Sequence, residues 1–291
     1  MTVILNVLSV VSILALVALG LAIVFGVMDI VNLAHGEFVT IGAFTLAVAQ
    51  GVGGSTAYWA ALLLAPLIGA ALGLLLEATV IRFLYHRPLD TLLATYALSL
   101  ILQKALELTF GKHPQAVQTP LPGTLTFLGT TYPSYRLFAI AVAALAIAGC
   151  IHVFARTRFG IELRAVIQNP SMAEAVGIDT KRLKRLAFCV GAGMASLAGV
   201  LVAPFAAVES QLGLTYLGKA FFVIVVGGIG SVAGSVVGSA LVGSVETLLN
   251  YQLDPSLSSA LVLVLAIALI RWRPQGLLPG FSATHHMLGK G

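Results

Sequence analysis

The chain has 291 residues and a net charge of +5; 59% of its residues are hydrophobic, only 9% are charged, and its mean hydropathy is +1.02. This composition excludes an ordinary soluble domain, in which about a quarter of the residues carry a charge. The positive charge does not indicate nucleic acid as a partner, because the basic residues lie in short loops beside apolar runs, a distribution typical of membrane proteins.

The apolar runs predict an all-α, polytopic membrane protein in which residues 1–291 form a single transmembrane domain. At about 20 residues for each span, the length leaves room for about eight or nine membrane helices, some of them broken or re-entrant. The first run is expected to be a retained span and not a signal peptide, because no cationic segment precedes it. The spans are expected at residues 4–26, 30–50, 58–81, 91–110, 136–155, 184–206, 219–250 and 256–271.

The second span contains a polar interruption, Asn-Leu-Ala-His-Gly-Glu-Phe at 32–38. Ionisable groups at membrane depth are costly unless they are paired or face water, so we place Asn32, His35 and Glu37 near a solute route. His35 and Glu37 would point about 200° apart on a continuous helix, and Gly36 is therefore expected to unwind the helix between them. The alternative is that these polar groups only satisfy freed backbone groups and hold a helix break in shape.

The 219–250 run is too long for one span, since its 32 residues would form a helix of about 48 Å across a hydrocarbon core of about 30 Å. Gly227, Gly228 and Gly230 are expected to break it, so that the chain crosses twice or enters and returns. The same glycines are expected to line the solute route or, alternatively, to allow close helix contact. The extra passage also puts the arginines that end the last apolar run on the same side as the basic 156–185 loop.

Small residues at helical spacing predict two packing seams, which serve either tight packing within one subunit or a subunit interface. The first seam comprises Ala192, Ala195, Ser196, Gly199 and Ala203, and the second comprises Gly230, Ser231, Gly234, Ser235, Gly238 and Ser239.

Isolated acidic residues and the two cysteines are given no chemical role. Asp29 is expected to be a helix N-cap. Carboxylates near predicted span ends are expected to be solvated or interfacial; they are Glu77, Glu107, Glu209 and Glu246. Both cysteines lie in apolar runs, which argues against a disulfide framework.

The 156–185 loop is expected to be cytoplasmic, since it carries seven of the sixteen basic residues. Residues 161–168 predict a short helix that ends at Asn169, because a residue before proline is pushed away from helical geometry. Ser171 and Glu174 fit a capping box for a second short helix.

Gly177 is placed to end this second helix. A basic and partly apolar loop of this kind either docks into a cleft on a soluble partner or lies on the membrane surface with its cations at the headgroups. The capping pattern does not choose between these two.

Several stretches together resemble the permease subunits of ATP-driven importers of the branched-chain amino acid and urea type. They are Gly-Leu-Ala-Ile-Val-Phe-Gly at 20–26 with the polar segment at 32–38, the 156–177 loop, Gly-Gly-Ile-Gly-Ser at 227–231, and Arg-Pro-Gln-Gly-Leu at 273–277. The resemblance extends over essentially the whole chain. Within the family, Arg-Pro-Leu-Asp-Thr-Leu-Leu-Ala-Thr at 87–95 and Thr-Arg-Phe-Gly at 157–160 look more like the urea and short-chain amide subgroup.

The resemblance implies a permease subunit of an ATP-binding-cassette importer in the bacterial plasma membrane. It implies a second permease chain, identical or related, two ATPase subunits and an extracytoplasmic solute-binding protein as partners, besides membrane lipid. The solute would be a branched-chain amino acid, urea or a short-chain amide. In this family the 161–178 segment is the coupling helix that docks on an ATPase, and the coupling residues carried over here are Arg164, Asn169, Ser171, Glu174 and Gly177.

Other function classes fit the residues less well. The chain has no Gly-x-x-x-x-Gly-Lys-Ser/Thr, so ATP and Mg²⁺ are expected on a separate subunit and no cofactor or metal on this one. His35-Gly36-Glu37 lacks the Pro-Cys-x-x-Cys half of a zinc deaminase signature, which argues against an enzyme. An ATP-independent channel or a secondary transporter for a small neutral solute is the alternative, although an ion-coupled transporter more often pairs charges within its spans.

Overall fold

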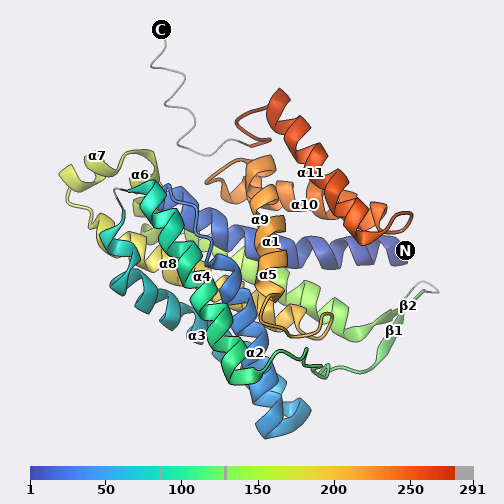
Figure 1. Cartoon of the computed structure of the whole chain (residues 1–291). Coiled ribbons are helices and arrows are strands. Elements are labelled where there is room, and N and C mark those ends of the chain that lie inside the picture. The colour runs from blue at the N-terminus through green and yellow to red at the C-terminus, as the bar shows by residue number, and fades with distance from the viewer. Residues whose placement is uncertain (86, 128–129, 279–291) are drawn as a thin grey trace.

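The computed structural model describes residues 1–85, 87–127 and 130–278, and over these residues the chain is a bundle of long α-helices (Figure 1). The long apolar helices are α1 (Thr2–Met28), α2 (His35–Gly53), α3 (Tyr58–Thr79), α4 (Pro88–Phe110), α5 (Ser134–Arg156), α8 (Thr180–Val202), α9 (Leu212–Gly227), α10 (Val232–Leu249) and α11 (Pro255–Trp272). In the described part, 7 helical segments are long and apolar enough to cross a membrane, and α2 and α3 together form one of them. The predicted all-α, polytopic class is confirmed.

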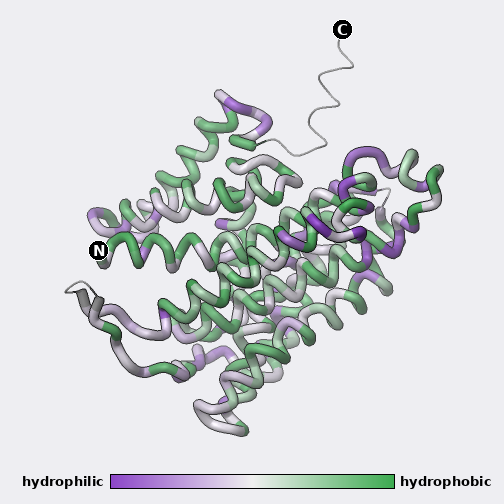
Figure 2. Tube along the Cα trace, turned by 180° about the vertical axis from the view of Figure 1, so that it is seen from behind, coloured by the Kyte–Doolittle hydropathy of each residue, from purple (hydrophilic) through white to green (hydrophobic). Residues whose placement is uncertain are grey.

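Short elements connect the long helices. They are the 3-10 turns η1 (Gly54–Ala57) and η2 (Ile81–Phe83), the antiparallel hairpin of β1 (Thr124–Phe127) and β2 (Thr130–Pro133), and the helices α6 (Arg158–Gln168) and α7 (Pro170–Ala175). The hairpin lies toward the N-terminal end of α1, whereas α6 and α7 lie at its other end (Figure 1). Hydrophilic residues gather around α6 and α7 (Figure 2). This end of the bundle is therefore the one that the positive charges assign to the cytoplasm.

α1 lies at the centre of the bundle (Figure 1). Residues 1–28 contain no Asp, Glu, Lys or Arg, and a helix that is apolar all round lies either in a protein core or in lipid. α5, α8, α9 and α10 all pack against it, and residues 13–24 of α1 are buried throughout.

The first packing seam holds α8 against α2 and α3. A Cβ added to Gly42 would overlap the carbonyl oxygen of Ser196, and a Cβ added to Gly199 would overlap that of Val39. A Cβ on Gly69 of α3 would meet the Ser196 hydroxyl. Tight packing within one subunit is therefore the correct interpretation of this seam.

The 219–250 run forms two helices that are separated by a glycine turn, as predicted. α9 begins earlier than expected, at Leu212, and its 16 residues extend only about 24 Å, which is short of a full crossing. Gly228 and Gly230, with φ of 118° and 71°, reverse the chain, and α10 returns along α9. The backbone N–H of Leu277 donates to Val226 at this turn, so the end of α11 lies on the α6 side of the bundle.

Two local expectations at the end of α1 are wrong. Asp29 ends α1 instead of opening a helix: its φ is 53°, and its N–H donates to the carbonyl of Phe25. Asp is among the few residues that accept this left-handed conformation. The second span accordingly begins at His35 and not at residue 30, because residues 29–34 are not helical.

The seam predicts opposite effects for two glycine substitutions. Gly42→Ala places a methyl group into the α8 backbone and should destabilise the protein by about 1–3 kcal/mol through overpacking. Gly149→Ala on the exposed side of α5 has nothing within 4 Å to meet and should stabilise its helix by up to about 1 kcal/mol. The thermal unfolding midpoints of the two variants in detergent measure both effects. Equal midpoints would contradict close packing at the first seam.

Candidate functional site

The polar segment found in the sequence forms a buried linker between α1 and α2. Asn32 Oδ1 accepts a hydrogen bond from the backbone N–H of Ala34 at 3.0 Å, and the N–H of Leu33 donates to Thr95 Oγ1 of α4 at 3.2 Å. Asn32 is 3% exposed. These linker N–H groups, which have no helical partner, thus find hydrogen bonds partly within the linker and partly on α4. Backbone polar groups at membrane depth need such partners, because lipid offers none.

Gly36 does not unwind the helix, and that expectation is wrong. It lies in the first turn of α2, where a Cβ would overlap the carbonyl of Gly213 at the start of α9. The break lies before His35 instead. Gly36 therefore allows α2 and α9 to cross at backbone distance.

His35 and Glu37 face different neighbours, as their spacing predicts. His35 Nε2 lies 3.2 Å from the carbonyl oxygen of Val17 in α1. Glu37 Oε1 accepts hydrogen bonds from Ser99 Oγ and Gln103 Nε2 of α4, both at 2.8 Å. His35 and Glu37 are fully buried, and three polar atoms of the cluster have no hydrogen-bond partner: Asn32 Nδ2, His35 Nδ1 and Glu37 Oε2.

The α4 partners of this cluster were missed by the sequence analysis. Polar residues recur at every fourth position on one buried face of α4, namely Thr91, Thr95, Ser99 and Gln103. Residues four apart lie on the same helix face. This spacing is a signal that could have identified them.

A first cavity lies at the outer end of α1, toward the β-hairpin. It consists of two adjoining spaces of about 150 Å³ and 380 Å³ that share Val10, Arg136 and Lys219. Arg136 Nη1 donates to Asn6 Oδ1 at 2.8 Å, and Lys219 Nζ lies 2.6 Å from Glu246 Oε1. This cavity brings charged residues from α5, α9 and α10 together over α1.

The expectation that Glu246 is solvated or interfacial is wrong, because it is 4% exposed and paired with Lys219. Sequence analysis missed Lys219 because α9 begins at residue 212, which places this lysine two turns inside the helix. Glu209 is exposed and Glu107 is bridged by two exposed lysines, as expected of solvated or interfacial carboxylates.

The same expectation is wrong for Glu77 of α3, which is 1% exposed. Its carboxylate accepts from Arg185 Nε at 2.9 Å and from the Tyr85 hydroxyl at 2.5 Å. Burial and the Glu77 contact raise the pKa of Tyr85, so its hydroxyl stays protonated and remains a donor. This pair joins α3 to α8 at the cytoplasmic end.

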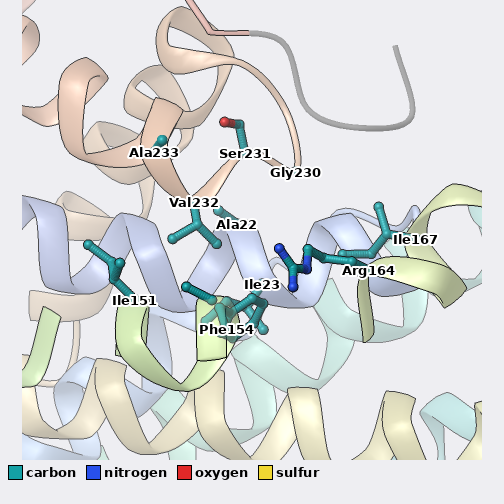
Figure 3. A pocket seen from close by; sticks show the side chains of 11 residues that line it. Ala22, Ile23, Ile151, Phe154, Arg164, Ile167, Gly230, Ser231, Val232 and Ala233 are labelled. Carbon is teal, nitrogen blue, oxygen red and sulfur yellow. The ribbon is translucent and has the colours of Figure 1, made fainter. Parts of the chain in front are cut away.

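A second cavity of about 240 Å³ lies at the inner end of α1 and is lined by α1, α5, α6 and the α9–α10 turn. The guanidinium of Arg164 extends from α6 toward Ile23 and Val232 (Figure 3). Arg164 Nε donates to its own helix at the carbonyl of Gly160, at 3.3 Å. The cavity thus brings Arg164, predicted as a coupling residue, together with Gly230, predicted as a pathway residue.

The glycine turn lies close to α1 and α6 beside this inner cavity. A Cβ on Gly26 would lie 3.1 Å from the Cα of Gly230 and 3.6 Å from Cδ1 of Ile167. Gly227 and Gly228 serve close contact instead: Gly227 meets α10, and Gly228 meets the chain that follows α11. The structure therefore places only Gly230, of these three glycines, on this cavity.

The two loop helices differ in detail from their prediction. Asn169, and not Ser171, caps α7, since Asn169 Oδ1 accepts from the N–H of Met172 at 3.0 Å and proline occupies the first helical position. Glu174 accepts from Thr180 Oγ1 at 2.6 Å instead of closing a capping box. Gly177 ends the helix as predicted, with φ of 87°.

The outer surface of these helices is partly apolar. Ile161, Met172 and Val176 are 57%, 62% and 70% exposed, beside the exposed Asn169, Ser171 and Glu174. In residues 1–85, 87–127 and 130–278, no three His, Cys, Asp or Glu side chains gather to hold a metal ion.

The region that matches known proteins covers almost all of the residues that the structure describes. The model of the family described as branched-chain amino acid transport system, permease component, matches residues 3–270. The chain is 29% identical to the high-affinity branched-chain amino acid transport system permease protein BraD of Pseudomonas aeruginosa, over 94% of each chain. It is 29% identical to LivH of Escherichia coli K12 over 91% of this chain and 90% of LivH. It is also 29% identical to LivM of Salmonella typhimurium, over 91% of this chain and 67% of LivM.

The α2–α4 contact predicts the effect of one substitution in the missed stripe. Gln103→Leu removes a donor from the buried Glu37 carboxylate and should destabilise the protein by about 1–3 kcal/mol. Tyr96→Phe on the exposed face of the same helix should leave stability within about 0.5 kcal/mol. Thermal unfolding in detergent compares the two, and a Gln103→Leu midpoint equal to that of Tyr96→Phe would show that the contact does not hold α2 to α4.

Proposed function

Because the chain belongs to the branched-chain amino acid transport permease family, we propose that it is a membrane-spanning subunit of an ATP-binding-cassette importer for a small polar solute. The solute in this proposal is a branched-chain amino acid, with urea and short-chain amides as the alternatives. An extracytoplasmic binding protein delivers it, and two separate ATPase subunits bind Mg²⁺ and hydrolyse ATP. No covalent chemistry takes place on this chain.

The observation that carries the proposal is the pair of cavities at opposite ends of α1. The outer cavity meets Leu14 and the inner one meets Ala22, which is eight positions further along α1, a rise of about 12 Å. Ala18 lies about 40° around the axis from each of them and is 0% exposed. A path with a space at each end and a closed middle fits an occluded stage of alternating access.

The polar cluster at the start of α2 stands beside this closed section. His35 contacts Val17, next to Ala18, so its unpartnered Nδ1 would become available to the solute when His35 moves away from α1. Asn32 Nδ2 and Glu37 Oε2 are two further buried polar atoms without a partner in the same segment. We assign the pathway to these three residues and Gly36, with Gly227, Gly228 and Gly230 forming the inner turn. Intramembrane polar groups without partners support such a role.

The coupling proposal rests on the surface of α6 and α7. Exposed apolar side chains at Ile161, Met172 and Val176 suit the cleft of an ATPase subunit, and the polar residues Asn169, Ser171 and Glu174 surround them. Movement of α6 would reach the pathway directly, since Arg164 and Ile167 line the inner cavity with Ala22 and Ile23 of α1. Gly177 keeps α7 short, so that both helices present one compact surface.

A second permease chain completes the proposed membrane core. The chain is similar to both LivH and LivM of Salmonella typhimurium, which are both named permease proteins of a high-affinity branched-chain amino acid transport system. This supports a core of two related or identical permeases.

The proposal predicts solute uptake that needs ATP and both soluble partners. In vesicles holding the permease pair and the ATPases, labelled leucine should accumulate only with ATP and the binding protein; urea and acetamide are tested in parallel. Met172→Glu with Val176→Glu should abolish this uptake by placing charge in the apolar contact with the ATPase. Leu125→Glu, at an exposed apolar residue of the distant hairpin, should leave it unchanged.

Two outcomes would contradict this function. Passive entry of a neutral solute through the chain alone, indifferent to ATP, would indicate a channel. Full uptake by the Met172→Glu, Val176→Glu variant would place the coupling surface elsewhere or leave these helices on the membrane surface.

A further inference from the structure

We propose that the outer cavity recognises the charged ends of an α-amino acid, with Glu246 accepting its ammonium group and Arg136 binding its carboxylate. The inference rests on the proposed import function and deepens it, because it selects a zwitterion over a neutral amide or urea. Lys219, which lines the same cavity, pairs with Glu246 and holds it in place in the absence of solute.

Glu246 has an unused acceptor beside the cavity. Its Oε1 pairs with Lys219 Nζ at 2.6 Å, whereas its Oε2 is buried without any hydrogen-bond partner. The side chain is 6% exposed and lines the space of about 380 Å³ as well as a further one of about 220 Å³ on the α11 side. A buried carboxylate oxygen with free lone pairs is a strong acceptor for an ammonium donor.

Arg136 of α5 supplies the complementary group in the same cavity. One of its terminal nitrogens donates to Asn6 Oδ1 at 2.8 Å, and its guanidinium lies 5.2 Å from the centre of the Phe205 ring. These contacts orient the planar group, which has five N–H donors and matches a carboxylate in two parallel hydrogen bonds. The charged residues that line the outer cavity are Arg136, Lys219 and Glu246, so one positive charge is left over for a solute carboxylate.

The cavity also offers a place for an aliphatic side chain. The adjoining space of about 150 Å³ is lined by Ile13, Leu14 and Phe205, directly beside Arg136 and Lys219. An amino acid such as leucine has the same division into a charged end and an apolar end. Urea has no apolar part and carries no charge for these groups to recognise.

A purely structural role explains the charges less well. A buried ion pair gives little net stability compared with apolar residues of similar size, and charge within membrane helices is expensive. α9 nevertheless places Lys219 two turns inside the helix, opposite Glu246 of α10. Recognition of a charged solute gives these residues a function that an apolar pair would not fulfil.

The test uses the reconstituted complex with saturating binding protein and measures ATP-dependent leucine uptake. Glu246→Gln and Arg136→Gln should each lower uptake roughly tenfold or more, which is the effect of losing one charge-assisted hydrogen bond. The double variant Lys219→Glu with Glu246→Lys keeps an ion pair, and hence the fold, but replaces the carboxylate by an ammonium. Its unfolding midpoint should match that of wild type while its leucine uptake stays roughly tenfold low or lower.

Lys112→Gln, an exposed cation on the outer side that does not line the cavity, is the control and should transport as wild type does. Restored leucine uptake in the charge-swapped variant would overturn the inference, since it would make the pair structural. Wild-type uptake by Glu246→Gln would overturn it as well. If the wild-type complex itself takes up no solute, it is the import function that fails, and the inference falls with it.

Discussion

The burial of residues 13–24 of one uncharged helix on all sides determines the rest of the structure. α5, α8, α9 and α10 pack against this helix, α1, and two cavities lie along it near its two ends. Both cavities therefore have α1 as a common wall. Side-chain hydrogen bonds link α1 to other parts of the chain at Asn6 near its outer end and at the carbonyl of Val17, which His35 contacts.

The forces along this helix differ between its ends and its middle. Ion pairs lie toward the two ends of the bundle, Lys219 with Glu246 at the outer cavity and Arg185 with Glu77 at the cytoplasmic side. The closed middle is held by close apolar contact, for example where Gly20 of α1 meets the backbone of Gly191 in α8. Van der Waals contact between small residues can be broken and remade without separating buried charges. This distribution allows α1 to shift against its neighbours while the ends of the bundle keep their pairing.

The sequence allowed the helices to be predicted but not their depth or their neighbours. Apolar runs located the long helices, although α9 begins seven residues before its run, and the glycines at 227–230 located the turn between α9 and α10, because both signals are local. The N-cap of α7 was assigned to Ser171 and not to Asn169, because both residue types cap helices. Asp29 was expected to open a helix although it ends α1, because Asp also accepts the left-handed conformation. Lys219 could not be recognised as a partner of Glu246, because the apolar run began at residue 219, whereas α9 begins two turns earlier at Leu212.

The most direct test of the account is the accessibility of α1 during turnover. With Cys150 and Cys189 replaced by serine, Ala18→Cys would be treated with membrane-impermeant thiol reagents from each side of vesicles that hold the complete complex. The account predicts protection in the resting state and, during ATP-driven transport, reaction from the outer and the inner side at different stages of the cycle. Protection that persists while solute accumulates, or reaction that needs no ATP, would contradict a path along α1 that opens alternately at its two ends.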